Sequence, residues 1–299
     1  MKNFRYPFMV LLGGAMYGTM SSFVRLLYAH GYNAAEIAFS QALLAAVFLG
    51  ILLFLSRFRG AQQPLSRKDL LSLLVTGGII GITNFLYYQS VSYISASLAI
   101  VILMQFTWFS LLLEWAVFGQ RPGKAELITV IFILIGTVMA GDLLHAKGLS
   151  VSWQGIVLAL ASSLTYAVYI VSNSRMPKGV KWQSKSTLIM VGSALTIFIV
   201  NAPTILTANH FGYAFLGWAI FLAVVGTTIP TALFAAGIPH IGAGTSSILM
   251  TIEFPVAVIC AHMVLGESVS PLQIGGIVLM LAAIAAMNYY KSLKTSKEI

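Results

Sequence analysis

The sequence is short of charge. Only 8% of its 299 residues are Asp, Glu, Lys or Arg, whereas about 25% is typical of soluble domains. Apolar residues make up 59%, so too few polar side chains remain to cover a soluble globule of this length. Roughly 20 predominantly apolar residues cross a bilayer as a helix. Long apolar runs without strict alternation exclude a β-barrel, so the composition predicts an all-α membrane protein.

Cysteine is nearly absent as well. Cys260 is the only one, which excludes an intrachain disulfide and a Cys-based metal site; we interpret it as a small packing residue. The sequences G-x-x-x-x-G-K-[ST] and HExxH are also missing, and His240 and His262 have no neighbouring ligand set. We therefore expect no metal, no cofactor and no nucleotide-driven step within this chain.

Ten apolar segments are long enough to cross a membrane, and short connections join them. The first has a basic flank, as a signal peptide has, but its apolar stretch is too long and no A-x-A-like site follows it. We expect it to be retained as a membrane span. The expected spans are 7–29, 34–56, 70–92, 96–118, 124–141, 153–173, 184–201, 213–238, 244–264 and 270–290.

The basic residues are concentrated in alternate loops of this ten-span scheme. Of the 17 Lys and Arg residues, 15 fall on one side, and only Arg25 and Lys147 fall on the other. The positive-inside rule then places both termini in the cytoplasm, which requires an even number of spans. The net charge of +9 is therefore a topology signal, and nucleic acid is not an expected partner.

Two segments of similar shape lie 147 positions apart (248 − 101). They read "VILMQFTWFSLLLEWAVFGQ" from residue 101 and "ILMTIEFPVAVICAHMVLGE" from residue 248. The same shift places Gly266 on Gly119, and a shift of 149 places Tyr166 on Tyr17. We therefore expect two five-span repeats, residues 1–146 and 147–299.

An odd number of spans in each repeat makes the second copy enter the membrane from the opposite side. Ten transmembrane helices arranged as two inverted five-helix repeats are typical of transporters, because the two halves can rock around a shared midplane site.

Each half begins with a small-small-x-x-Tyr helix, and the second half carries the motif "EFPVAVICAHMVLGESVSPLQIGGIVLMLAAIA". With these motifs in two five-span halves, the chain resembles an EamA-type member of the drug/metabolite transporter superfamily. The first half has Trp108 and Gln120 where Pro and Glu are usual. The resemblance implies a central cavity lined by the first, third and fourth helices of each half, with the fifth helices at the periphery. It also implies export of small metabolites, among them amino acids and toxic amphiphiles.

Glu253 is an acid near the membrane midplane, about nine residues into the ninth expected span. A charge at that depth costs at least about 2.5 kcal/mol, and such residues usually face a cavity or a partner. Two interpretations stand: a cavity acid that binds a substrate amine or a coupling proton, or a protonated residue that makes one interhelical hydrogen bond. Pro255 favours a site slightly, because it frees backbone carbonyls nearby.

Other polar and aromatic side chains at similar depth are candidate cavity residues. Pairs three or four positions apart share a helix face, and a polar face there either joins helices or lines the cavity. Trp108 either stacks on a solute or only packs. Glu114 either lines the inner vestibule, or reaches interfacial water or pairs with Arg121. With Glu253, the candidates are Tyr17, Ser21, Asn84, Tyr88, Gln105, Trp108, Glu114, Ser162 and Tyr166.

Four glycines have the small-x-x-x-small spacing that permits close approach of helices, namely Gly14 with Gly18 and Gly77 with Gly81. Near the outer loop, Arg25 and Glu36 are placed to pair with each other.

Two classes of function are compatible with these features. The first is a secondary transporter that exports small metabolites across the cytoplasmic membrane by alternating access. The second is a membrane-embedded enzyme acting on lipid-linked substrates, which would need convergent catalytic groups that the sequence does not offer to Glu253. The partners of the favoured transporter are the lipid bilayer, a small-molecule substrate and, in one interpretation, a coupling proton. The sequence leaves the oligomeric state open.

Overall fold

The computed structural model describes residues 4–57, 65–94, 96–140, 152–176, 179–266 and 268–297, and these segments are helical with no strand. Its elements are α1 (Arg5–Gly18), α2 (Met20–Ala29), α3 (Ala34–Arg57), α4 (Arg67–Val91), α5 (Ala96–Leu103), α6 (Phe106–Phe118), α7 (Lys124–Ala140), α8 (Trp153–Ser174), α9 (Trp182–Thr207), α10 (Tyr213–Ala223), the π-helix η1 (Val224–Thr228), α11 (Ile229–Ile241), α12 (Ala243–Met250), α13 (Glu253–Leu265) and α14 (Pro271–Lys297).

In these described segments, nine helical stretches are long and apolar enough to cross a membrane. Some of these stretches join consecutive elements end to end, such as α5 with α6 and α12 with α13. The remaining expected span corresponds to α7, whose described part is 17 residues long. The all-helical prediction is confirmed, and the tenth crossing stays a prediction.

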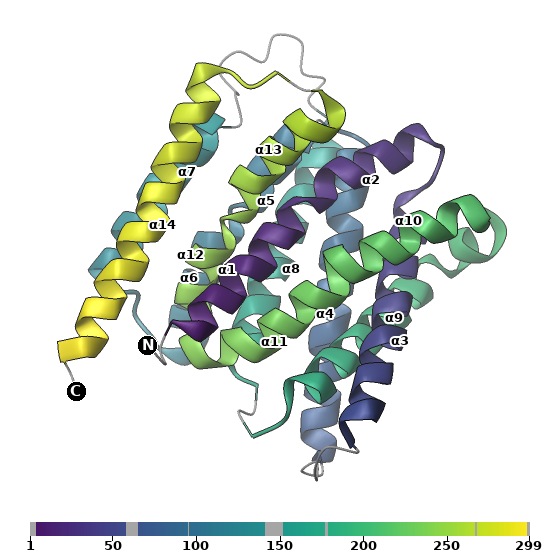
Figure 1. Ribbon diagram of the computed structural model, residues 1–299, viewed down its shortest axis with the longest axis horizontal. Coiled ribbons are helices and arrows are strands. Elements are labelled where there is room, and N and C mark those ends of the chain that lie inside the picture. The colour runs from purple at the N-terminus through teal and green to yellow at the C-terminus, as the bar shows by residue number, and fades with distance from the viewer. Residues whose placement is uncertain are drawn as a thin grey trace.

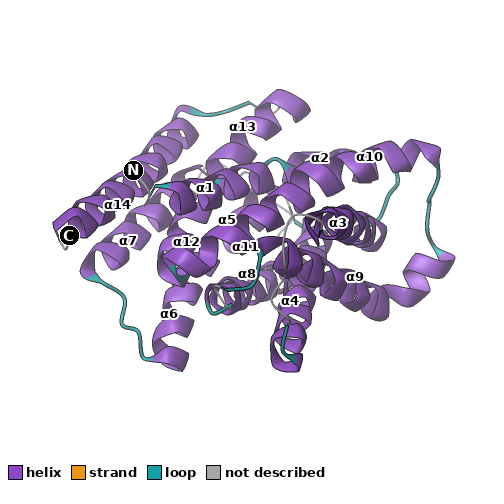
Figure 2. Ribbon diagram, turned by 60° about the horizontal axis from the view of Figure 1, so that its bottom comes forward, coloured by secondary structure: helices purple, strands orange, loops and turns teal. Residues whose placement is uncertain are grey.

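Helix contacts between the halves occur in matched pairs. The third helix of the first half, α4, packs on the first helix of the second half, α8. In the same way, α11 of the second half packs on α1 of the first half. Likewise α6 packs on α8, and α13 packs on α1. The fifth helices of the two halves, α7 and α14, lie side by side at one edge of the molecule (Figures 1 and 2). The first and fourth helices are thereby placed at the centre.

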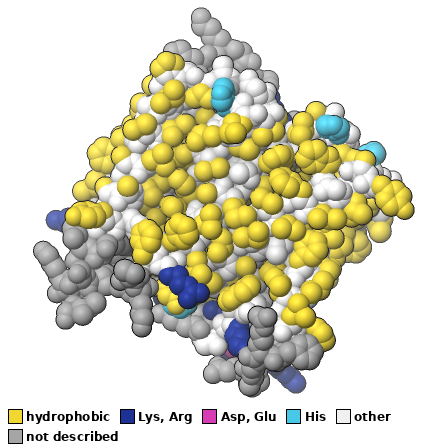
Figure 3. Space-filling view, in the orientation of Figure 1, with side chains coloured by type: hydrophobic (Ala, Val, Ile, Leu, Met, Phe, Trp, Pro, Cys, Tyr) yellow, Lys and Arg dark blue, Asp and Glu magenta, His cyan; other side chains and the backbone are white. Residues whose placement is uncertain are grey.

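The start of α1 and the end of α14 lie close together at the lower left of Figure 1. The ends of α3, α8 and the start of α9 also lie on this lower side, which carries the basic loops. Hydrophobic side chains cover most of the face in Figure 3, as expected for a surface in contact with lipid. An even number of membrane crossings requires the two ends of the chain to lie on the same side.

Both fourth helices are interrupted at equivalent positions. The interruption at Met104–Gln105 and the one at Thr251–Ile252 are 147 positions apart (251 − 104 and 252 − 105). At each, the backbone tightens into i→i−3 hydrogen bonds, from Gln105 to the Ile102 carbonyl (3.1 Å) and from Ile252 to the Leu249 carbonyl (3.3 Å). Such bonds mark a short 3₁₀ turn inside a longer helix.

Proline alone does not cause these interruptions. Pro255 follows the second interruption, but Trp108 stands at the equivalent position after the first. Polar side chains bond to the preceding turn in both places. The Thr251 hydroxyl donates to the Ile248 carbonyl (2.6 Å), and the Gln105 amide donates to the Val101 carbonyl (3.2 Å). Bonds of this kind compete with the regular helix ladder and bend it.

The glycines with small-x-x-x-small spacing face the backbone of a neighbouring helix. A Cβ on Gly18 would overlap the Glu253 carbonyl oxygen, and one on Gly77 would overlap the Ile189 carbonyl oxygen. From the other side of the same contact, a Cβ on Gly192 would overlap the Leu74 carbonyl oxygen. Because glycine has no Cβ at these positions, α1 can approach α13 closely and α4 can approach α9 closely.

Candidate functional site

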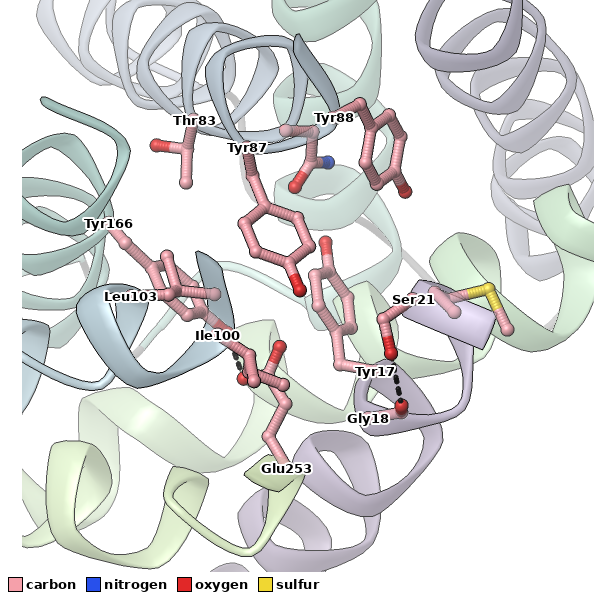
Figure 4. Close-up of a pocket in the computed structure, with 12 residues that line it drawn as sticks. Tyr17, Gly18, Ser21, Thr83, Tyr87, Tyr88, Ile100, Leu103, Tyr166 and Glu253 are labelled. Carbon is pink, nitrogen blue, oxygen red and sulfur yellow. Dashed lines mark hydrogen bonds between the residues drawn. The ribbon is translucent and has the colours of Figure 1, made fainter. Parts of the chain in front are cut away.

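A small cavity lies at the centre of the molecule, between α1, α2, α4, α5, α8 and α13 (Figure 4). Its walls come from both halves of the chain. Of the candidates named from the sequence, six line it: Tyr17, Ser21, Asn84, Tyr88, Tyr166 and Glu253. The structure therefore brings together residues that are as far apart as 236 positions in the sequence (253 − 17).

Glu253 is the acidic group of this cavity. It is the first residue of α13, it is buried, and its carboxylate accepts a hydrogen bond from the Tyr166 hydroxyl at 3.3 Å. Within the described segments, no Lys, Arg or His forms an ion pair with it. A buried carboxyl without a cation is costly in the charged form, so it is suited to carry a proton or to accept a cationic ligand.

Aromatic rings surround this carboxyl. Tyr166 stacks with Tyr17 at a centroid distance of 6.4 Å and with Tyr169 at 6.2 Å. Phe106 meets the Tyr166 ring edge-on at 4.7 Å. Because Phe106 is the position equivalent to Glu253 in the first half (253 − 147), the two repeat-related residues contact the same tyrosine, one through its ring and one through its hydroxyl.

Tyr87 is a cavity residue that was not among the candidates from the sequence. Its hydroxyl is buried and has no hydrogen-bond partner in the described structure, and in Figure 4 its ring extends toward Tyr17. The sequence does contain a signal for it, since Tyr87 lies three positions after Asn84 and so shares its helix face. An unpaired buried hydroxyl is costly, and a bound ligand or water would relieve that cost.

The cavity is closed in this conformation. Its volume is about 20 Å³, whereas pockets that hold small molecules measure about 300–1,000 Å³. Ser21 and Ile100 line it and also line a second cavity of about 30 Å³ between α2, α5, α13 and α14, toward the upper side of Figure 1.

Glu114 lies on the side of the molecule opposite to this second cavity. Its carboxylate accepts one bond from Arg175 Nη2 and another from the Gly244 backbone N–H, both at 3.1 Å. Glu114 belongs to α6 of the first half, whereas Arg175 follows α8 and Gly244 is the second residue of α12 in the second half. The ion pair therefore connects the two halves below the cavity. The basic partner of Glu114 is Arg175, whereas the sequence suggested Arg121.

Besides Glu114, the structure places three further candidates away from the cavity. Gln105 accepts a hydrogen bond from the Trp108 indole (2.8 Å), and Trp108 is 36% exposed on the outer surface of the bundle. Ser162 is fully buried and donates to the Thr83 carbonyl (2.9 Å), so it joins α8 to α4.

Two further residues singled out from the sequence make structural contacts. Glu36 accepts bonds from the backbone N–H groups of Asn33 (2.7 Å) and His210 (2.8 Å), which fixes two neighbouring loops. Cys260 donates to the carbonyl of Thr19, the residue between α1 and α2, at 3.7 Å.

These observations define a polytopic helical membrane protein with a polar cavity between two structurally related halves. The chain belongs to the EamA-like transporter family, whose model matches it twice, over residues 5–141 and 153–289.

Several relatives are similar over most of their length. The threonine/homoserine exporter RhtA of Escherichia coli strain K12 is 26% identical, over 84% of this chain and 80% of its own. An uncharacterised transporter of Archaeoglobus fulgidus is also 26% identical, over 92% of this chain and 93% of its own. A solved crystal structure aligns with a TM-score of 0.69, at 14% identity, over 92% of this chain and 98% of that one. This last likeness shows the shared fold alone.

Proposed function

We propose that this protein is a secondary transporter that exports small metabolites with a cationic amine, amino acids among them, across the cytoplasmic membrane. The observation that carries the proposal is Glu253, a buried carboxyl with no cationic partner in the described structure, at a cavity shared by both halves. In a low-dielectric site, such a group binds either an ammonium group or a proton strongly.

The relatives support the direction of transport and the class of substrate. RhtA is named an exporter of threonine and homoserine, and both of these carry the α-ammonium group that Glu253 would bind. The bacterial transporters among the relatives also support a place in the cytoplasmic membrane. Aromatic rings around the acid would contact the substrate beside its ammonium group and contribute cation–π attraction.

We further propose that residues 1–146 and 147–299 move against each other in alternating access. The equivalent interruptions of both fourth helices at the cavity support this, because discontinuous helices at the interface of inverted repeats form the substrate sites of many transporters. The described conformation would be closed at the lower side by Glu114 and Arg175.

Purified protein in proteoliposomes tests the proposal directly. Vesicles loaded with one labelled compound at a time, either threonine, homoserine, another amino acid or an organic cation, should release at least one of these faster than protein-free vesicles. The released compound should be chemically unchanged. Conversion of the compound in place of its release would instead favour the membrane-embedded enzyme.

Topology gives the first prediction. With Cys260→Ser as background, Gly179→Cys, in the basic loop before α9, should resist an impermeant maleimide in intact cells and react in inside-out vesicles. His30→Cys, in the loop after α2, should show the reverse pattern, because five expected spans, an odd number, separate the two positions and the basic loops are expected inside. Labelling of Gly179→Cys from outside the cell would contradict cytoplasmic termini.

The tyrosines beside Glu253 give the second prediction. Tyr166→Phe removes the hydroxyl that donates to Glu253 and keeps the ring that packs on Phe106. We expect the apparent substrate affinity to fall roughly three- to tenfold, as for loss of one hydrogen bond worth about 0.5–1.5 kcal/mol. Tyr17→Phe should act in the same direction. If both variants lose thermal stability and keep wild-type transport kinetics, the tyrosines are packing residues.

The lower ion pair gives the third prediction. Arg175→Gln should weaken the closure below the cavity, so that Thr245→Cys, in the Cys260→Ser background, reacts several times faster with maleimide in inside-out vesicles. Arg121→Gln is the matched control, because Arg121 lines the same part of the surface and its charge is not bonded to Glu114. Equal acceleration by both variants would show that general charge, and not this ion pair, controls access.

A further inference from the structure

A second, larger pocket lies between α1, α3, α9 and α11, on the lower side of Figure 1 that carries the basic loops. Its volume is about 630 Å³, which falls within the range of about 300–1,000 Å³ for sites that hold small molecules. It is distinct from the central cavity, since no residue lines both. The proposed transport mechanism does not use it.

Lys185 is the residue that marks this pocket as a site. It lies in the second turn of α9, it is only 2% exposed, and it lines the pocket. Within the described segments, no hydrogen bond or ion pair of its side chain is found. A desolvated ammonium group without a counter-charge is costly, so an anion in the pocket would stabilise it.

The other charges on the pocket have the same sign. Arg5 at the start of α1 and Lys181 at the start of α9 line it together with Lys185, and no Asp or Glu is found among its described lining residues. One wall is aromatic: the Tyr6 and His240 rings stack at 3.9 Å with their planes 2° apart. Three basic side chains around one space fit a ligand with a phosphate group.

The pocket also opens sideways, toward the surface that faces lipid. Leu52 of α3 and Ile229 of α11 line it and are 44% and 39% exposed, and Trp182 at the start of α9 is 37% exposed. A free phosphate would gain nothing from these apolar side chains. A phospholipid would place its headgroup among the basic residues and its acyl chains along Leu52 and Ile229.

We propose that this pocket binds the headgroup of an anionic phospholipid from the cytoplasmic leaflet. Lys185, Arg5 and Lys181 pair with the phosphate, Trp182 lies at the level of the headgroups, and the acyl chains follow the exposed apolar sides of α3 and α11. Basic pockets between membrane-spanning helices on the cytoplasmic side recognise anionic headgroups in this way. The bound lipid would join α1 and α3 of the first half to α9 and α11 of the second.

The experiment measures the thermal unfolding of purified protein in detergent as lipid is added. Phosphatidylglycerol should raise the unfolding temperature saturably, whereas phosphatidylcholine and glycerol 1-phosphate should not. Lys185→Met and Arg5→Gln should each raise the half-saturating concentration of phosphatidylglycerol roughly fivefold or more. Lys68→Met, at the exposed start of α4, is the matched control and should respond as the wild type.

Arg5 is exposed, so Arg5→Gln keeps the test valid if Lys185→Met does not fold. Equal stabilisation by phosphatidylcholine, or an unchanged response of Arg5→Gln and Lys185→Met, would overturn the proposal. Stabilisation by glycerol 1-phosphate as strong as that by phosphatidylglycerol would also overturn it, because the pocket would then bind soluble phosphate esters.

Discussion

Glu253→Gln should lower export of an amine-bearing substrate by roughly ten- to a hundredfold at neutral pH. This variant keeps the size of the side chain and an acceptor for the Tyr166 hydroxyl, but it removes the carboxylate. Hydrogen bonds to charged groups are worth about 1.5–3 kcal/mol, and about 1.4 kcal/mol is a factor of ten. The residual transport should also lose most of its dependence on pH between 5 and 8, because the group that exchanges a proton is gone.

Initial rates of efflux from proteoliposomes, measured across this pH range, check the prediction. Glu126→Gln is the control, since Glu126 is a carboxyl at the start of α7 that does not line the central cavity. It should keep the wild-type rate and pH profile. An unchanged rate, affinity and pH profile for Glu253→Gln would leave Glu253 as a structural hydrogen-bonding residue, the second interpretation that the sequence allows.

Gly77→Ala should destabilise the protein far more than replacement of an exposed helical glycine. The new methyl group would overlap the Ile189 carbonyl oxygen, which is backbone and cannot rotate away. α4 and α9 would therefore have to separate. Gly192 of α9 belongs to the same close contact, since a Cβ there would overlap the Leu74 carbonyl oxygen of α4. Overpacking of this kind costs about 1–3 kcal/mol and sometimes more, so the unfolding temperature in detergent should fall by several degrees.

Gly217→Ala provides the control for the intrinsic effect of replacing a helical glycine. Gly217 is exposed on α10 and nothing lies within 4 Å of its potential Cβ. Its replacement should be neutral or slightly stabilising, because Ala is favoured over Gly in helices by about 1 kcal/mol. If Gly77→Ala unfolds at the same temperature as Gly217→Ala, close contact between α4 and α9 is not a main source of stability.

The helical class of the fold could be predicted from composition, because apolar runs of this length satisfy the backbone only as helices in lipid. Equivalence of the two fourth helices could also be predicted, since Gly119 and Gly266 align; both adopt the left-handed conformation that ends α6 and α13 (φ of 67° and 68°). Their interruptions could not be predicted from proline, because only one of the two has it. They depend on local bonds from Thr251 and Gln105.

The site could be predicted in part, for a geometric reason. Side chains on uninterrupted helices, such as Asn84 and Tyr88 on α4, keep the face that helical spacing assigns to them. Gln105 and Trp108 share a face as expected, since the Trp108 indole donates to Gln105. That face does not line the cavity, whereas Phe106 beside Gln105 contacts Tyr166. The partner of Glu114 is 61 positions away in the sequence (175 − 114), so only the packing of the halves reveals it.

The ion pair between Glu114 and Arg175 has a consequence for the energetics of the proposed transport cycle. If the two repeats had identical sequences, the inward-open and outward-open conformations would be related by a two-fold rotation in the membrane plane and would have equal free energy. The position equivalent to Glu114 in the second half is Ala261 (114 + 147), which lines the small upper cavity with a methyl group in place of a carboxylate. In the proposed transport cycle, the lower ion pair would stabilise the conformation that is closed below, and Ala261 cannot form an equivalent ion pair above. This difference between the repeats would bias the empty protein toward the state that is closed on the lower side.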